Sequence, residues 1–340
     1  MNQTPNTVSL HKAKQIIPHL LNGNVVPFMH SSPAIGKSSI AKQLAKEANL
    51  KLIDLRLTEL DSSDLNGLPY FDNGKATFMP FDTFPLESTP IPTGFNGWLL
   101  LLDELNSASQ SVQAAAYKLI LDRMVGQHKL HSNVAIIACG NLDTDNAITT
   151  PLSSALISRF AHLYIHLDKD EWLDWASTNG INPLVTAFIG FRPELLYTFK
   201  PEATSSYASP RTWQMLSNVL EDKPEDKSIL LPLVSSLVDD GVATEFMQFI
   251  DLQDKLPKYA DIINNPSDIE LDTNLGIQWA LLAMLTSNLR AEDFNAVQTF
   301  IRRMYIELQV VALKQIVSKH PALTAKTLDW QKSLAKEIFL

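Results

Sequence analysis

A Gly-Lys-Ser triplet lies between an apolar stretch and an amphipathic one near the start of the chain, in HSSPAIGKSSIAKQL at residues 30–44. Residues 25–30 (VVPFMH) predict a short buried strand, and residues 38–48 predict a helix with its apolar side chains on one face. Residues 51–57 (KLIDLRL) predict a second strand. A strand, a loop, a helix and a second strand in this order are the context that a phosphate-binding loop requires.

The next hundred residues continue this alternation of strands and helices. The predicted helices are 10–22, capped by Ser9 and ended by Gly23, and 109–123; the further predicted strands are 98–102, 133–139 and one ending near 167. Residues 70–78 predict a hairpin that turns at Asn73-Gly74. The strands are apolar on both faces, which predicts an α/β fold with a parallel sheet between layers of helices.

After residue 168 the strand pattern fades and helical spacing takes over. We therefore expect a core domain at 1–167, with an irregular hairpin insertion at about 58–97. A helical domain is expected at 168–268. A weaker boundary near 265–272 (NNPSDIELD) predicts a separate helical C-terminal region at 269–340.

Composition narrows the possible functions. The chain has 340 residues, of which 45% are hydrophobic, and a net charge of −9, whereas nucleic-acid-binding proteins present basic surfaces. No stretch reaches the ~18 apolar residues of a membrane span, and the N-terminal residues lack a secretory pattern. The single cysteine, Cys139, cannot form an internal disulfide. We expect a cytoplasmic protein without a membrane span, and the acidic net charge counts against nucleic acid as its main substrate.

The Gly-Lys-Ser triplet completes most of the phosphate-loop pattern Gly-x4-Gly-Lys-Ser/Thr, but Ser31 stands where the first glycine belongs. If the loop keeps a backbone with positive φ there, the serine costs about 1 kcal/mol. The backbone N–H groups of residues 34–38 can hold phosphate oxygens, Lys37 can reach the β- and γ-phosphates, and the Ser38 hydroxyl can bind Mg²⁺. The residues predicted to bind ATP and Mg²⁺ are Ser32, Pro33, Ala34, Ile35, Gly36, Lys37, Ser38, Ser39 and Asp103, with Ser38 and Asp103 as the magnesium ligands.

Polar residues follow the next two buried strands. Asp103 and Glu104 come directly after WLLLL, where a carboxylate can hold Mg²⁺ and its neighbour can polarise an attacking water. Asn141 ends the strand after that and can hold a water near the γ-phosphate. Arg159, in ALISRF, precedes the last strand; from the residues alone, a surface salt bridge is its commonest role.

The order of these motifs resembles the AAA+ ATPases: strand–loop–helix, then LLLLDELN, CGN, SRF and SPRTW. The connecting segments, LTELDSSDLNGLPYF, LDELNSASQSVQAAAYKLILDRMVG and PLSSALISRF, are similar to the MoxR branch. The resemblance covers about 28–215 and extends less specifically to about 266.

The resemblance implies an αβα core, a helical lid over residues 168–268 and assembly as a ring, usually of six subunits. It implies that Lys37 and Ser38 form the Walker A pair and that Asp103 and Glu104 form the Walker B pair. By position, Asn141 would be sensor 1, Arg159 the arginine finger that reaches a neighbouring subunit, and Arg211 sensor 2. Ser31 and Ala34 depart from the usual glycines, which affects the expected nucleotide affinity but not the catalytic roles.

The leading hypothesis is therefore a magnesium-dependent ATPase that remodels or activates a protein partner. By resemblance, that partner carries a von Willebrand factor A domain. The alternatives are a nucleic-acid motor and a scaffold that assembles with ATP but scarcely hydrolyses it. Aromatic residues of the insertion either grip a polypeptide or pack the hairpin onto the core; they are Tyr70, Phe71, Phe78, Phe81 and Phe84. Four histidines lack metal-ligand spacing, so we expect structural roles for them; they are His128, His131, His162 and His166.

Overall fold

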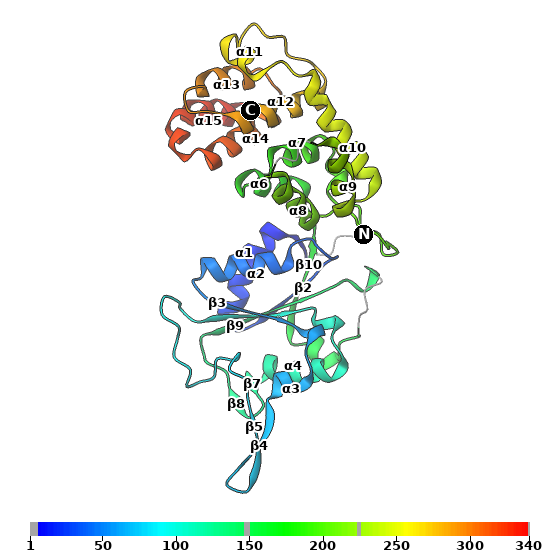
Figure 1. Ribbon diagram of the computed structural model, residues 1–340. Coiled ribbons are helices and arrows are strands. Elements are labelled where there is room, and N and C mark those ends of the chain that lie inside the picture. Colours follow the sequence, from blue (N-terminus) through cyan, green and yellow to red (C-terminus); the bar gives the residue numbers. More distant parts are fainter. Residues whose placement is uncertain (1–5, 146–149, 223–225, 339–340) are drawn as a thin grey trace. The chain divides into compact units, whose positions relative to one another are not determined.

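The computed structural model describes residues 6–145, 150–222 and 226–338. The chain divides into two compact units, Met1–Leu167 and Asp168–Leu340 (Figure 1).

The first unit is built on a six-stranded parallel sheet with the strand order β1-β10-β2-β9-β6-β3. Its strands are β1 (Thr7–Ser9), β2 (Val26–His30), β3 (Lys51–Arg56), β6 (Trp98–Asp103), β9 (Val134–Gly140) and β10 (Phe160–His166). Its helices are α1 (Leu10–Asn22), α2 (Lys37–Glu47), α3 (Ser62–Asn66), α4 (Gln110–Leu121) and α5 (Ser154–Ile157). Two antiparallel hairpins pair β4 (Leu68–Asp72) with β5 (Lys75–Met79) and β7 (Met124–Val125) with β8 (His128–Lys129).

Helices cover both faces of this sheet, with α1 and α2 on one side and α3 and α4 on the other (Figure 1). Strand β6, which lies between β9 and β3, is buried along Trp98–Leu102, since alternate side chains of a strand enter opposite helix layers. On the α4 side, Leu100 and Leu102 join the core with Val112 and Leu119. The predicted α/β fold with a parallel sheet and helices on both faces is confirmed.

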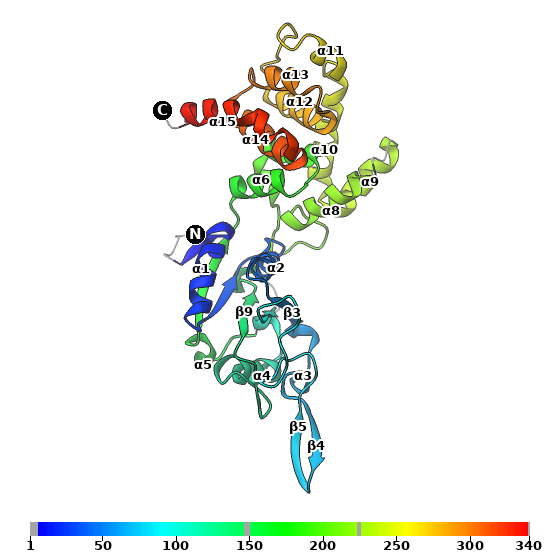
Figure 2. The same ribbon diagram turned by 90° about the vertical axis from the view of Figure 1, so that its left-hand side faces the viewer.

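The β4–β5 hairpin projects away from the sheet (Figure 2). It turns at Asn73 and Gly74, whose φ angles of 48° and 75° suit an Asn-Gly turn. Its exposed apolar side chains, with the exposed fraction of each, are Leu68 (50%), Tyr70 (41%), Phe71 (80%), Phe78 (41%) and Met79 (53%). Of the five aromatic residues weighed above, only Phe84 is buried, at 4% exposure, and Phe81 is 38% exposed. The rings of the hairpin itself therefore do not pack onto the core.

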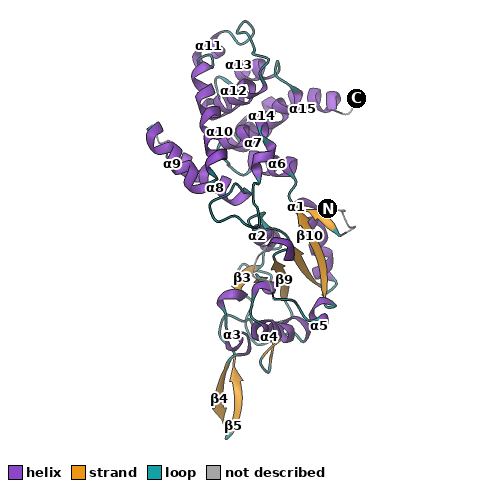
Figure 3. Ribbon diagram, turned by 90° about the vertical axis from the view of Figure 1, so that its right-hand side faces the viewer, coloured by secondary structure: helices purple, strands orange, loops and turns teal. Residues whose placement is uncertain are grey.

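The second unit is helical in its described residues. Its helices are α6 (Lys169–Thr178), α7 (Pro183–Phe191), α8 (Pro210–Leu220), α9 (Lys227–Leu237), α10 (Asp240–Asp251), α11 (Tyr259–Asn264), α12 (Leu275–Asn288), α13 (Phe294–Ile301), α14 (Ile306–Lys319) and α15 (Thr324–Ile338), coloured purple in Figure 3. Phe188, Trp213 and Phe246 pack together at the centre of its first helices, with ring centroids 5.1–5.8 Å apart. Helix α12 packs on α7, and α14 packs on α6, so helices from both sides of residue 268 share one unit.

None of the helices in the described ranges is both long enough and apolar enough to cross a bilayer.

Candidate active site

The Gly-Lys-Ser triplet lies at the carboxyl end of β2, where the chain turns into α2. Gly36 is the N-cap of α2 and has φ 123°, a backbone conformation that glycine adopts readily. A Cβ at this position would also lie 3.3 Å from Cδ1 of Leu10, so the loop packs closely against the start of α1. The first N–H groups of α2 have no acceptor within the helix and can bind an anion.

The strained residue of the loop is Ala34 rather than Ser31. Ala34 has φ 61°, in the left-handed region, where a non-glycine residue costs about 1–2 kcal/mol. Ser31 is not among the described residues with positive φ, so the condition under which a serine would be strained there is not met. Because the backbone at Ser31 is ordinary, a serine fits there without a conformational cost.

Ser31 instead contacts the lysine of the triplet. The Lys37 ammonium donates to the carbonyl of Ser31 (2.8 Å) and to its hydroxyl (2.9 Å), and more weakly to the carbonyl of Ser32 (3.3 Å). It also lies 3.4 Å from Oδ1 of Asn141. Lys37 and Ser31 are both buried, at 8% and 0% exposure. The loop thus holds the ammonium on its inner side, next to the end of β9.

The two predicted magnesium ligands are in direct contact. The Ser38 hydroxyl donates a hydrogen bond of 2.6 Å to Oδ2 of Asp103, which ends β6. Mg²⁺ prefers oxygen ligands, and this pair offers a hydroxyl and a carboxylate at one point beside the loop. The chemistry of these donors therefore fits a magnesium ion.

Glu104 is held next to Asp103 by its backbone and its side chain. Its backbone is left-handed (φ 59°), and its N–H donates to Oδ1 of Asp103 (3.0 Å). Its Oε2 accepts a 2.6 Å hydrogen bond from the Thr58 hydroxyl. A non-glycine residue in this conformation is a form of strain that often marks functional sites. The carboxylate is thereby fixed at the carboxyl edge of the sheet.

Asn141 is clamped by a second asparagine, Asn106, which follows the acidic pair. The side chain of Asn106 accepts from the backbone N–H of Asn141 (3.0 Å) and donates to its carbonyl (2.8 Å). Asn106 is 6% exposed. A Cβ on Gly140 would lie 2.3 Å from Oδ1 of Asn106, so glycine is required there for the two segments to approach. This clamp fixes the backbone from which the Asn141 side chain reaches Lys37.

Arg159 lies at the other end of the sheet. It immediately precedes β10, and Phe160 pairs with Val26, the first residue of β2, whereas Tyr164 pairs with His30 beside the phosphate loop. Four residues of extended strand separate these two pairs by about 13 Å. Arg159 is exposed, and its Nη1 donates to the hydroxyl of Ser158 (2.7 Å). The fold therefore does not bring Arg159 to the cluster around Lys37.

Arg211 belongs to the helical unit, where it is the second residue of α8 and is exposed. Ser209 and Thr212 form a capping box around it, and Pro210 occupies the first helical position. The SPRTW motif is thus a helix start, which accounts for its residue types locally.

Burial changes two pKa values next to the site. The pKa of Cys139 is raised well above its usual value, first by burial and second by the charge of Asp103. The pKa of His30, the residue before Ser31, is lowered to about 4 by burial and by the neighbouring His162 and Lys37. The Cys139 thiol and the His30 imidazole are thus both neutral at pH 7.

Sequence reasoning did not identify three side chains that shape the site: Thr58, Asn106 and Asp145. Asp145 accepts from the hydroxyl of Ser32 (3.1 Å), and its second oxygen is buried without a hydrogen-bond partner among the described residues. Thr58 stands immediately after the predicted strand 51–57 and Asn106 stands four residues after the predicted strand 98–102, and closeness to a strand end was the available signal. No spacing pattern connects any of the three to the motifs.

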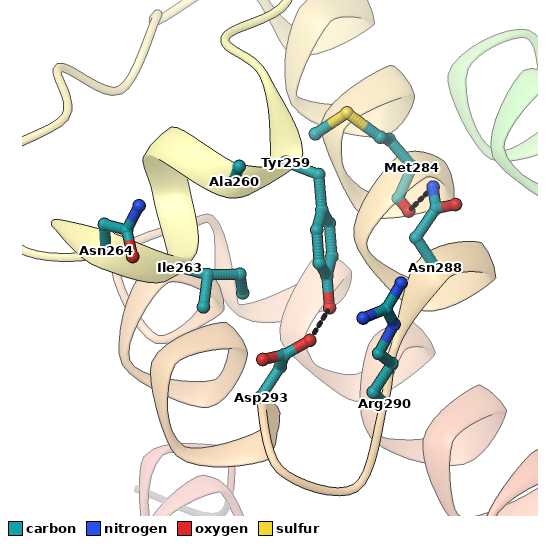
Figure 4. A pocket seen from close by; sticks show the side chains of 8 residues that line it. All are labelled: Tyr259, Ala260, Ile263, Asn264, Met284, Asn288, Arg290 and Asp293. Carbon is teal, nitrogen blue, oxygen red and sulfur yellow. Dashed lines mark hydrogen bonds between the residues drawn. The ribbon is translucent and has the colours of Figure 1, made fainter.

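A separate concave region of about 490 Å³ lies in the helical unit between α11, α12 and α13 (Figure 4). The Tyr259 hydroxyl donates to Oδ2 of Asp293 (3.1 Å) there, and the guanidinium of Arg290 points toward the same space. Burial and this hydrogen bond raise the pKa of Tyr259 to about 12. None of the residues predicted from the sequence lines this pocket.

Comparison with known families agrees with the geometry of the first unit. The profile of the ATPase family associated with various cellular activities (AAA) matches residues 28–166, from β2 to the end of β10. Residues 28–166 are thus similar to an AAA ATPase domain, and they contain the loop, both acidic residues, Asn141 and Arg159.

Comparison with solved structures finds, among its matches, a mutant of RuvB from Thermotoga maritima and NtrX from Brucella abortus in complex with ATP. The RuvB mutant is 14% identical with a TM-score of 0.39, over 78% of this chain and 81% of that chain. The NtrX complex is 14% identical with a TM-score of 0.41, over 98% of this chain and 70% of that chain.

Proposed function

We propose that this chain, with its region similar to an AAA ATPase domain, is a magnesium-dependent ATPase of the MoxR type. It works as a homo-oligomeric ring of six subunits and remodels or activates a protein partner. By resemblance, the partner is a protein with a von Willebrand factor A domain.

One observation carries the proposal: residues from three separate chain segments meet at one edge of the sheet. Lys37 contacts Asn141, and Ser38 contacts Asp103, so the phosphate loop touches the ends of both β6 and β9. Phosphoryl transfer depends mainly on positioning and on neutralising charge. The groups around the N-terminus of α2 can meet both needs. They are the Lys37 ammonium, the Ser38–Asp103 pair, the Glu104 carboxylate and the Asn141 amide.

Each residue has a role in this proposal. The N–H groups at the start of α2 and the Lys37 ammonium hold the phosphates, and Ser38 and Asp103 would hold Mg²⁺. When bound, Mg²⁺ would neutralise charge on the phosphate oxygens. Glu104 orients the attacking water and accepts its proton, for which its fixed carboxylate is suited. The Asn141 amide holds that water near the γ-phosphate.

Arg159 acts on a neighbouring subunit. Its position at the opposite end of β10 supports this, because Arg159 does not reach the loop of its own chain. Such arginines raise hydrolysis by about 10³–10⁵ in well-studied nucleotidases. Arg211 contacts the nucleotide from the helical unit, with residues 168–268 as a lid and residues 269–340 as a further region.

The β4–β5 hairpin is the proposed contact for a polypeptide. It projects from the unit and exposes apolar side chains, of which Phe71 is the most accessible at 80%. Its base is held by β7–β8: His128 Nε2 bonds the carbonyl of Phe78 (3.0 Å), and Thr77 donates to Gln127 (3.1 Å). Apolar rings on a braced hairpin suit binding to an unfolded segment.

ATP turnover per protomer, measured against protein concentration with Mg²⁺ present, tests the proposal. A rate that rises with concentration and is lost in Arg159→Ala supports catalytic sites completed between subunits. Arg302→Ala removes another exposed arginine that donates to a serine hydroxyl; it is the matched control and keeps its rate. A turnover in Arg159→Ala equal to that of the wild type would contradict the proposed role of this arginine.

The same assay separates the alternatives. Stimulation by DNA that falls steeply with salt would favour a nucleic-acid motor. Bound ATP and ring assembly with no turnover would favour a scaffold. For the hairpin, Phe71→Ser is expected to keep the basal rate and to lose any stimulation by casein, used as an unfolded polypeptide. Equal stimulation in this variant would exclude Phe71 as a contact.

A further inference from the structure

Two histidines on neighbouring strands form a hydrogen-bonded pair beside the phosphate loop. His30 is the last residue of β2, and His162 lies within β10. Nε2 of His30 lies 2.9 Å from Nδ1 of His162, and Nε2 of His162 lies 2.8 Å from the carbonyl oxygen of Ile157. The sequence predicted a structural role for His162 but gave no indication of these partners.

The carbonyl at one end of this chain of contacts fixes the direction of both hydrogen bonds. A carbonyl oxygen only accepts, so Nε2 of His162 carries the proton. Nδ1 of a neutral His162 is then an acceptor, and Nε2 of His30 must donate to it. The two rings therefore form a directed bridge from His30 through His162 to Ile157.

The bridge joins the two ends of the proposed machinery. At one end, His30 precedes Ser31, whose carbonyl and hydroxyl hold the Lys37 ammonium. At the other end, Ile157 is the last residue of α5 and stands two residues before Arg159. Figure 2 shows α2 and α5 at opposite ends of the sheet that β2 and β10 span.

We propose that His162 is a positioning residue, which fixes the segment that carries Arg159 to the strand that carries the phosphate loop. This inference rests on the proposed function, because it assigns His162 an effect that passes through Arg159. Helix α5 is a single turn, and its final carbonyl oxygens lack N–H donors within the helix. The His162 imidazole binds one of them and so restricts the backbone from which Arg159 extends.

Aromatic packing keeps the two rings in register. His30 stacks on Tyr164 with ring centroids 4.8 Å apart, and the ring centroids of His30 and Phe28 are 3.9 Å apart. Phe28 and Phe160 are buried in the core below them. A phenylalanine at position 162 would keep a ring in this stack while removing both hydrogen bonds, which makes His162→Phe the informative variant.

The test combines variant subunits in one ring. Glu104→Gln subunits lack turnover at their own site but carry an intact Arg159, whereas Arg159→Ala subunits have the reverse defect. Mixing the two is expected to restore ATP turnover. His162→Phe is expected to lower turnover by about tenfold or more alone, because small misplacements of a catalytic group are costly. It is also expected to regain turnover when it is mixed with Glu104→Gln.

The outcomes separate this inference from the function on which it rests. If the mixture of Arg159→Ala with Glu104→Gln regains ATP turnover and the mixture of His162→Phe with Glu104→Gln does not, the inference is overturned and the proposed function stands. Failure of the Arg159→Ala mixture would overturn the trans role of Arg159, and with it the effect assigned to His162. Wild-type turnover in His162→Phe alone would overturn the inference directly. Tyr164→Phe, which keeps its ring, serves as the control and keeps the wild-type rate.

The bridge itself has a readout that does not depend on activity. Selective ¹⁵N labelling of histidine should show His162 protonated at Nε2 and unprotonated at Nδ1 near pH 7. A coupling across the N–H···N hydrogen bond should connect it to Nε2 of His30. His162 protonated at Nδ1 would contradict the bridge, and a folded His30→Phe protein should lose the coupling.

Discussion

The Ser38 hydroxyl donates a 2.6 Å hydrogen bond to the carboxylate of Asp103, and this contact joins the start of α2 to the end of β6. The two residues are 65 positions apart in the chain. A hydroxyl oxygen and a carboxylate oxygen thus lie together beside the phosphate loop, where both would bind one magnesium ion.

Asp103→Asn is expected to raise the Mg²⁺ concentration needed for half-maximal turnover by about tenfold or more, since an amide is a weaker ligand than a carboxylate. ATP binding without Mg²⁺ should change little. A magnesium titration of the turnover rate checks this. Asp54→Asn, on β3 and paired with Lys42, is the matched control and should leave the titration unchanged. An unaltered midpoint in Asp103→Asn would remove this residue from the metal site.

Ser31→Ala removes the hydroxyl that contacts the Lys37 ammonium but keeps the carbonyl contact. To bind a phosphate oxygen, the Lys37 ammonium must give up some of its hydrogen bonds within the loop. Removing the Ser31 hydroxyl, which competes with phosphate, is therefore expected to tighten ATP binding. A hydrogen bond to a charged group is worth about 1.5–3 kcal/mol, and the predicted gain in affinity is about tenfold. Calorimetric titration with ATP measures it.

Ser31→Gly should tighten binding less, because glycine adds backbone freedom to the unliganded loop. Weaker ATP binding in Ser31→Ala would mean that the hydroxyl holds the ammonium in its phosphate-binding position.

Asn106→Ala is expected to lower the turnover number while the Kd for ATP stays within about threefold. The variant leaves the N–H and the carbonyl of Asn141 without their side-chain partners, so the Asn141 amide loses its fixed position. Turnover and ATP binding are measured separately, with the thermal midpoint as a check of folding. Asn96→Ala removes a comparable bond to the carbonyl of Ala48 and should affect neither quantity. If Asn106→Ala lost ATP binding together with turnover, the variant would have disrupted the whole nucleotide site and not only the position of the Asn141 amide.

The pKa of His30, lowered to about 4 from 6.5, makes stability depend on pH. Between these values the unfolded chain binds a proton at His30 that the folded chain does not. The free energy of unfolding should therefore fall as the pH drops from about 6.5 toward 4, by at most about 3 kcal/mol, and this term should be constant above pH 6.5. Urea unfolding of the full chain at several pH values tests this. His30→Phe should show a shallower dependence, and an identical slope would rule out His30 as its source.

The parallel sheet could be predicted because its inner strands include continuous apolar runs, Trp98–Leu102 and Val134–Cys139, which are buried on both faces. The start of α1 followed from its cap, since Ser9 accepts from the N–H of Lys12 as expected. The strands β1, β7 and β8 have two or three residues, which is too few to show a period of two. The pairing of β1 depends on β10, which is distant in the chain, whereas β7 and β8 pair with each other across a short turn.

The motif residues of the site could be predicted because each stands at the end of an apolar strand or in a loop with a recognised spacing. Single polar residues without such spacing, such as Thr58 and Asn106, could not be predicted from the sequence. The contact from Thr58 to Glu104 and the clamp of Asn106 on Asn141 arise only when separate strands come together. The left-handed residue of the loop is Ala34 and not Ser31, which could not be predicted either, because φ angles depend on how the whole loop packs.

The placement of Arg159 and the phosphate loop at opposite ends of one sheet has a consequence for symmetry. A contact that brings Arg159 of one copy to Lys37 of the next joins two different surfaces, so it is heterologous and runs head to tail. An open series of copies then keeps one unused surface of each kind, one at either end, until it closes on itself. The rotation between successive copies decides whether the assembly is a closed cycle or an open filament, and a change at either surface would shift that choice.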